Sequence, residues 1–211
     1  MNIYTQTFEG MAPVRRLTNC KYNQHPKSLS PDGKVLIYTE IHPETLLDIW
    51  MLEMDGDTVS KPFLKTNFSE TQPILSPNGR WIVYVSNEQG EEQIFICSFP
   101  GKKSKIQITK TGGIEPLWAP DGKEIYYKDP SGSRLMAVPF FTDPEVYVGE
   151  SRILFKGKFK ASPLFGPNYD ITPDGKKFLM IEEEEKSSRA TQINVILNWA
   201  EDLKRLVPID N

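Results

Sequence analysis

Four polar residues occupy equivalent places in a repeated pattern and offer the chemistry of a binding site. They are His25, Gln72, Glu115 and Asn168, each standing directly before the proline or tyrosine that opens a strand-like run. Glu115, Gln72 and Asn168 carry carboxylate or amide oxygens, the hard ligands that Ca²⁺ takes in proteins. A metal held there would support metal-assisted hydrolysis. Because one carboxylate is sparse coordination for Ca²⁺, the plainer interpretation, in which these side chains face water or a ligand, stays open.

The sequence indicates no other catalytic centre. Its two histidines are His25 and His42, and neither has an evident serine or cysteine partner for a triad. A Gly-x-Ser-x-Gly nucleophile motif does not occur. Cys20 and Cys97 fall in different repeats and form no CxxC pair, so a zinc ligand set is missing. We therefore predict no catalytic residue, no bound metal and no cofactor.

A repeated turn marks the elements that must position the four polar residues. The run Ser30-Pro31-Asp32-Gly33-Lys34 recurs with small changes at residues 76–80, 119–123 and 172–176. Proline presets φ for the first corner, Asp or Asn tolerates the second, and glycine takes the positive φ that follows. The turn glycines lie at positions 33, 79, 122 and 175, which are 46, 43 and 53 residues apart. A period near 45 residues with strand-like flanks is typical of a radial β array.

Apolar residues alternate beside each turn. Leu36 with Tyr38, and Ile82 with Tyr84, are two residues apart and therefore lie on one face of a strand. With the strands that follow, each unit predicts four antiparallel strands, which is one blade of a β-propeller. We predict an all-β fold with blades at about residues 22–66, 70–110, 114–157 and 167–198. First strands line the channel of a propeller, so the four polar residues should gather around its axis.

The two ends of the chain are out of phase with these blades. Residues 1–19 predict a half-blade, and the last unit predicts three strands followed by a short helix at 199–206. The sum is about five blades in one domain, residues 1–211. Two closures stay open, because an unpaired edge strand invites aggregation. Either the terminal strands pair in a small closed ring, or the chain is an open half-ring that a partner completes.

The terminal segments supply the candidates for a partner interface. Asn198 caps the predicted helix, and an apolar stripe along it must be covered by this chain or by another. The first predicted strand contributes two further residues. The interface candidates are Ile3, Tyr4, Trp199, Leu203 and Leu206.

Composition excludes several functions. The chain has 211 residues, a net charge of −3 and a pI of about 5.6, whereas nucleic-acid binding normally requires a basic face. No apolar stretch approaches the roughly 20 residues of a membrane helix. The first residues lack the apolar core of a signal peptide, so the chain as written is expected to be soluble and cytoplasmic, and the compartment itself stays open.

Several linked motifs occur in one order along the chain, at residues 67–73, 76–81, 84–88, 112–118 and 121–127. In them the chain resembles the TolB-type, WD-like bacterial β-propellers, some of which are periplasmic. More narrowly, it is similar to the C-terminal propeller of bacterial eukaryotic-type serine/threonine kinases, which typically end as this chain does around Asn198-Trp199. Kinase motifs are missing, so kinase activity is not implied. The resemblance implies a propeller used for binding or sensing.

The function predicted from these observations is a non-catalytic protein-interaction or ligand-sensing module. Its protein or small-molecule ligand is not identified by the sequence. One alternative is a small metal-assisted, lactonase-like hydrolase with its site at the axial channel mouth. A second is a structural homo-oligomer assembled from half-propellers through the terminal blades.

Overall fold

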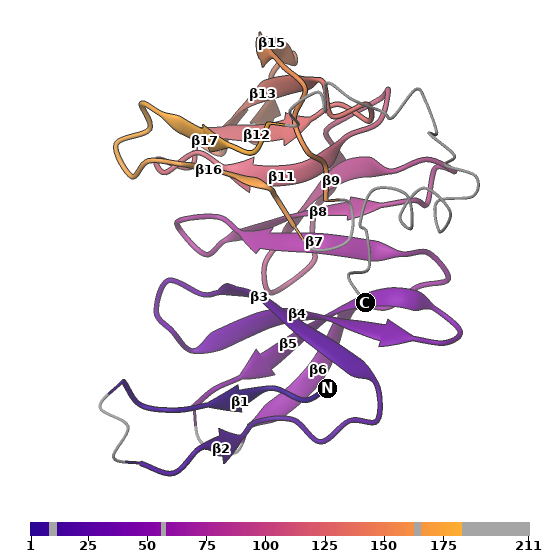
Figure 1. Cartoon of the computed structure of the whole chain (residues 1–211), viewed down its shortest axis with the longest axis vertical. Helices are drawn as coiled ribbons and strands as arrows, with labels where there is room; N and C mark the ends of the chain where they lie inside the picture. Colours follow the sequence, from indigo (N-terminus) through magenta and orange to yellow (C-terminus); the bar gives the residue numbers. More distant parts are fainter. Residues whose placement is uncertain (9–11, 56–57, 163–165, 183–211) are drawn as a thin grey trace, which may run out of the picture.

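A computed structural model describes residues 1–8, 12–55, 58–162 and 166–182 of the chain. Within these ranges the structure consists of β-strands and connecting turns, so no helix that could cross a bilayer is found there. Antiparallel sheets follow one another in chain order, from β1–β2 at the bottom of Figure 1 to β16–β17 near the top. The all-β, propeller-type fold predicted from the sequence is confirmed.

Three of the sheets are complete four-stranded blades. Blade 1 contains β3 (Asn23–Leu29), β4 (Val35–His42), β5 (Leu46–Glu53) and β6 (Val59–Leu64). Blade 2 contains β7 (Glu70–Leu75), β8 (Trp81–Ser86), β9 (Gln93–Ser98) and β10 (Lys105–Gln107). Blade 3 contains β11 (Ile114–Trp118), β12 (Glu124–Lys128), β13 (Arg134–Phe141) and β15 (Arg152–Lys156), with the short β14 (Tyr147–Val148) also paired to β13.

Two-stranded sheets flank the blades. They are β1 (Tyr4–Thr5) with β2 (Arg15–Arg16), and β16 (Tyr169–Ile171) with β17 (Phe178–Met180). The two sheets lie at opposite ends of the molecule, and no ladder between described strands joins them (Figure 1). The described strands therefore do not form the predicted terminal pairing that would close a ring. The predicted third strand of the last blade and the helix at 199–206 lie outside the described residues.

Each repeated turn is held by its own side chains. In the first turn the Ser30 hydroxyl donates to Asp32 Oδ1 at 2.6 Å and accepts from the Val35 amide at 2.9 Å. Asp32 Oδ1 also accepts from the Lys34 amide at 3.1 Å, and Gly33 has a φ of 73°. These bonds satisfy backbone groups that the tight turn leaves unpaired. The turn therefore joins the first strand of a blade to the second without a flexible loop.

Aromatic side chains fill the interfaces between blades. Phe140 packs edge-to-face against Trp81 and Trp118, with ring centres 5.3 and 5.4 Å apart, and so joins blades 2 and 3. Such pairs prefer this geometry because of the ring quadrupole. Ile3 is buried beneath β1–β2, where its side chain packs in the cluster that contains Tyr38 of blade 1. Apolar side chains are thus buried between the faces of neighbouring sheets.

A buried carboxyl group lies between blades 1 and 2. Glu70 is 1 % exposed, and its Oε1 accepts from the Thr66 hydroxyl at 2.5 Å. Its Oε2 has no hydrogen-bond partner in the described structure. Burial raises the pKa of Glu70, and the nearby charge of Asp48 raises it further. The ionised form of Glu70 is therefore less stable in the folded protein than in water.

We expect this group to make the stability of the protein depend on pH. Because the folded-state pKa of Glu70 is raised, the unfolded chain gives up this proton first, and stability falls as pH rises from about 4.5 through the folded pKa. In Glu70→Gln the melting temperature should change less over this range, which thermal unfolding followed by circular dichroism would measure. The exposed Glu91→Gln is the control, and equal slopes in the two variants would contradict the prediction.

Candidate functional site

Two of the four predicted polar residues occupy bends in the first strands of their blades. Gln72 in β7 and Glu115 in β11 have φ values of 53° and 55°, and the pairing register shifts beside each of them. The left-handed region costs a residue with a side chain on the order of 1–2 kcal/mol. Such a conformation persists only where surrounding contacts compensate for it. The side chains of both residues supply these contacts.

Two hydrogen bonds connect equivalent positions of successive repeats, namely Gln72, Glu115 and Asn168. Gln72 Oε1 accepts from the Glu115 amide at 2.7 Å, and Glu115 Oε2 accepts from the Asn168 amide at 2.9 Å. The side chains of Gln72 and Glu115 thus each bind the backbone of the equivalent residue in the following repeat. The Tyr169 hydroxyl adds a third bond by donating to the Glu115 carbonyl at 2.7 Å. The spacing seen in the sequence does bring these three positions together.

The carboxylate of Glu115 is the centre of this buried cluster. Lys128 Nζ lies 3.0 Å from Glu115 Oε2, and both side chains are fully buried. The Ser162 amide donates to Glu115 Oε1. Lys128 also donates to the Lys160 carbonyl at 2.7 Å and lies 5.3 Å from the centre of the Tyr169 ring. Burial of charge is costly unless it is paired and hydrogen-bonded, and here both conditions are met.

These contacts make Ca²⁺ binding, the alternative considered from the sequence, unfavourable at Glu115. Its oxygens already accept from two amides and a lysine, and a cation placed there would meet the positive charge of Lys128. Gln72 and Glu115 are 1 % and 0 % exposed, so neither side chain faces the water of a channel mouth. In the part of the chain that the structure describes, no group of three or more His, Cys, Asp or Glu residues could hold a metal.

His25 and Asn168 have different surroundings. His25 is half-buried in β3 opposite Thr39, and burial, followed by the charge of Lys27, lowers its pKa. Asn168 precedes β16 and lines a groove formed by the first strands of successive sheets. The role of either residue in binding a ligand stays a prediction.

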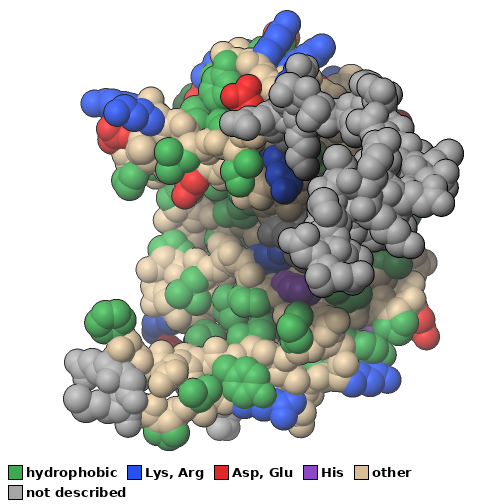
Figure 2. Space-filling view, in the orientation of Figure 1, with side chains coloured by type: hydrophobic (Ala, Val, Ile, Leu, Met, Phe, Trp, Pro, Cys, Tyr) green, Lys and Arg blue, Asp and Glu red, His purple; other side chains and the backbone are tan. Residues whose placement is uncertain are grey.

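The groove beside Asn168 has a volume of about 550 Å³. Its walls come from β3, β7, β11, β16 and β17, and they are mainly apolar. Lining residues are Lys27, Ile74, Leu117, Pro167, Asn168, Tyr169, Asp170, Leu179, Met180 and Ile181. Leu179 and Ile181 are 66 % and 51 % exposed, and burial lowers the pKa of Lys27. We call this the axial groove. Figure 2 shows that hydrophobic side chains are spread over the face of the molecule that Figure 1 presents.

Sequence reasoning missed most of these groove residues. Lys27 stands two residues after His25, and Leu117 stands two residues after Glu115. Residues two apart share a strand face wherever the strand is regular, so this offset could have identified both residues as neighbours of the predicted site. The bends in these strands shift the alternation of side chains by one residue, and the simple rule therefore does not apply there.

The residues predicted for a partner interface lie in different surroundings. Ile3 is 6 % exposed and belongs to the chain's own core, whereas Tyr4 is 56 % exposed on β1. Ile3 is therefore not available to a partner in this structure. Trp199, Leu203 and Leu206 lie outside the described residues.

Several known proteins with sequences similar to this chain are TolB proteins. No family model matches the chain. It is 29 % identical over 175 residues to the Tol-Pal system protein TolB of Francisella tularensis, which covers 81 % of this chain and 39 % of the relative. It is 41 % identical over 101 residues to TolB of Hydrogenovibrio crunogenus, covering 47 % of this chain and 22 % of the relative. The chain therefore spans less than half the length of either relative.

Solved structures with a similar fold include two TolB propellers. TolB from Acinetobacter baumannii has a TM-score of 0.62 at 24 % identity, over 84 % of this chain and 42 % of that one. The putative TolB from Agrobacterium tumefaciens has a TM-score of 0.60 at 24 % identity, over 85 % and 64 %. An oligogalacturonate lyase in complex with manganese has a TM-score of 0.59 at 18 % identity, over 80 % and 47 %. None of these five is named as a kinase-associated propeller, so the narrower resemblance stays a prediction.

We expect the Glu115–Lys128 pair to be the most sensitive polar contact of the described structure. Lys128→Met would leave the Glu115 carboxylate buried without its cation and should destabilise the protein by about 3–5 kcal/mol. Urea unfolding would measure this loss, and adding Glu115→Gln to the same chain should recover part of it.

The exposed pair Lys61–Glu53, at 2.9 Å, provides the matched control. Lys61→Met should cost less than about 1 kcal/mol, because solvent screens exposed pairs. Equal losses for Lys61→Met and Lys128→Met would show that the buried cluster has no special role in stability.

Proposed function

Because the chain has a TolB-type β-propeller fold, we propose that it is a non-catalytic binding module that holds a partner's peptide segment in the axial groove. The volume and mainly apolar lining of the groove support this proposal, since such concave sites are where proteins usually bind ligands. The exposed side chains of Leu179 and Ile181 support it further. Both would lose contact with water when a partner is bound.

The chemistry of the groove suggests what the segment carries. Apolar side chains would pack on Ile74, Leu117 and Leu179. We therefore propose that the segment is an apolar peptide.

The hydrolase alternative has weaker support. A metal-assisted reaction needs a ligand set with open positions, whereas the Glu115 carboxylate is engaged by Lys128 and by two amides. The manganese-bound lyase is similar to this chain in fold, but at 18 % identity its bound metal is no evidence for a metal site in this chain.

A panned peptide library tests the binding function. Random 12-residue peptides displayed on phage would be selected against the full chain, and enriched peptides measured by calorimetry. Leu179→Glu should weaken their binding about tenfold or more, because a buried charge would replace apolar contact. Val59→Glu, an exposed position on β6 outside the groove, should leave affinity unchanged. Selected peptides that bind Leu179→Glu as tightly as the wild type would exclude the axial groove.

A second candidate function is self-association through the β1–β2 sheet. Tyr4 in β1 and Val14, directly before β2, are 56 % and 57 % exposed, and Phe8, in the segment between the two strands, is fully exposed. Exposed apolar side chains of this kind can form part of an interface.

Solution mass decides whether the sheet associates. If β1–β2 joins two copies, light scattering after gel filtration should give twice the 24.1 kDa of one chain. Tyr4→Lys should then return the protein to a monomer, because like charges would meet across a twofold interface. A wild-type monomer at high micromolar concentration would exclude this candidate.

A further inference from the structure

Successive repeated turns stack on one another at the end of the blades. The Cβ position of Gly79, in the second turn, lies 3.0 Å from Cδ of Pro31 in the first. The Cβ position of Gly122, in the third turn, lies 3.6 Å from Cδ of Pro77 in the second. Each glycine thus leaves room for the proline ring of the turn before it. This contact repeats from blade 1 to blade 3.

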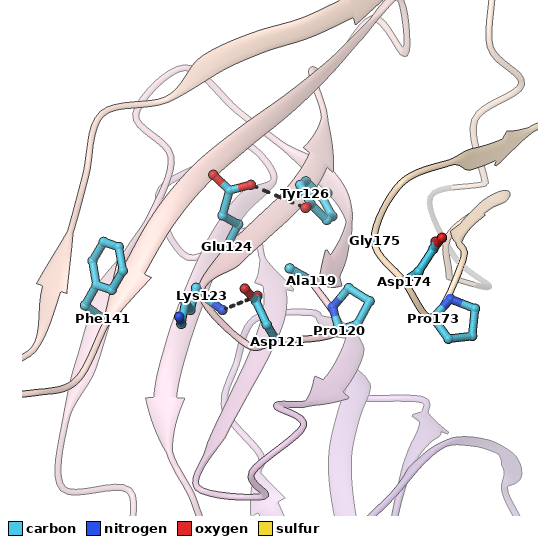
Figure 3. Close-up of a pocket in the computed structure, with 10 residues that line it drawn as sticks. All are labelled: Ala119, Pro120, Asp121, Lys123, Glu124, Tyr126, Phe141, Pro173, Asp174 and Gly175. Atoms are coloured by element: carbon cyan, nitrogen blue, oxygen red, sulfur yellow. Dashed lines mark hydrogen bonds between the residues drawn. The ribbon is translucent and has the colours of Figure 1, made fainter.

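The third step of the stack is missing. No described atom lies within 4 Å of the Cβ position of Gly175, so Pro120 does not pack against it. A cleft of about 590 Å³ opens between these two turns instead (Figure 3). The turn glycines are also 53 residues apart at this step, against 46 and 43 at the two before it.

Two carboxylates stand on opposite sides of the cleft. Figure 3 shows Asp121 beside Pro120 on one side and Asp174 beside Pro173 on the other. In the described structure no lysine or arginine nitrogen lies within 4 Å of either carboxylate. The Thr172 hydroxyl bond lowers the pKa of Asp174 from its ordinary value.

Asp121 is held less firmly than its equivalents in the other turns. Position 119 is alanine, whereas the hydroxyl groups of Ser30 and Thr172 donate to the acid of their own turn. Asp121 Oδ1 accepts only from the Lys123 amide, at 3.0 Å. One oxygen of this exposed carboxylate is therefore available to a ligand.

The remaining walls suit an aliphatic chain that ends in a cation. Phe141, 43 % exposed, supplies apolar surface to the cleft, and the buried side chains of Ala119 and Tyr126 lie behind its wall. Glu124 already pairs with Arg152, with Nη1 2.6 Å from Oε1, so a guanidinium group is accommodated at the edge. Lys123 is the one lysine or arginine that lines the cleft, against the three acids Asp121, Glu124 and Asp174.

We propose that this cleft binds an arginine side chain of a partner protein. Its methylene groups would lie between Pro120 and Gly175, and its guanidinium group would pair with Asp121 or with Asp174, the acids on the two sides of the cleft. Arginine suits the site better than lysine, because its planar group carries five N–H donors and can pair with a carboxylate through two parallel hydrogen bonds. The site lies at the repeated turns and does not depend on the axial groove.

The blocked peptide acetyl-Gly-Arg-Gly-amide is the probe. Titrated into ¹⁵N-labelled full-length protein, it should shift the amide signals of Gly122 and Gly175 at millimolar concentration. Asp121→Asn combined with Asp174→Asn should weaken binding about tenfold or more, because two charge-assisted hydrogen bonds are lost. Asp32→Asn, which removes the same charge from the first turn, is the control and should bind as the wild type does.

Two further peptides test the chemistry. The citrulline analogue keeps the shape but not the charge, and it should not bind. The lysine analogue should bind more weakly than the arginine peptide. Ala119→Ser should also lower affinity, because the new hydroxyl would donate to Asp121 as Ser30 does to Asp32. Binding of citrulline equal to that of arginine, retained binding in the double variant, or no shift at Gly122 and Gly175 would each overturn the proposal.

Discussion

The buried carboxylate of Glu115 is the interaction on which the arrangement of the later sheets depends. A charge in the interior requires partners, and these come from separate parts of the chain: Lys128 of the same blade, the Ser162 amide and the Asn168 amide. The Glu115 amide is in turn bound by Gln72 of the preceding blade. Because these bonds join separate segments, the cluster ties β7, β11 and β16 to one another.

That cluster also separates scaffold from binding surface. The side chains of Gln72 and Glu115 are engaged in hydrogen bonds within the fold. The same bonds compensate for the left-handed backbone conformation of both residues. The two sites that we propose for partners, the axial groove and the cleft between the third and fourth repeated turns, are lined by neither of these residues. Residues equivalent in the repeat are therefore structural in the middle of the array, while Asn168 also lines an open groove.

Sequence reasoning succeeded where geometry is local. The four turns were predictable because proline fixes φ at one corner, glycine readily adopts the positive φ that follows, and Asp or Asn bonds the adjacent backbone. The gathering of Gln72, Glu115 and Asn168 was predictable because the repeat makes their positions equivalent. Lys128 was not predictable, since it ends an apolar strand without a motif, and its partnership with Glu115 exists only after β11 and β12 pair.

By itself the sequence determined the repeat, the turns, the all-β blades and the proximity of Gln72, Glu115 and Asn168. These follow from backbone restrictions and side-chain alternation, which act over a few residues. Only the tertiary structure determined that Glu115 is a buried ion-pair partner rather than a water-facing ligand, and that Pro120 does not stack on Gly175. Both depend on the distance between neighbouring blades, which is set by packing between side chains far apart in the chain and leaves no local pattern in the sequence.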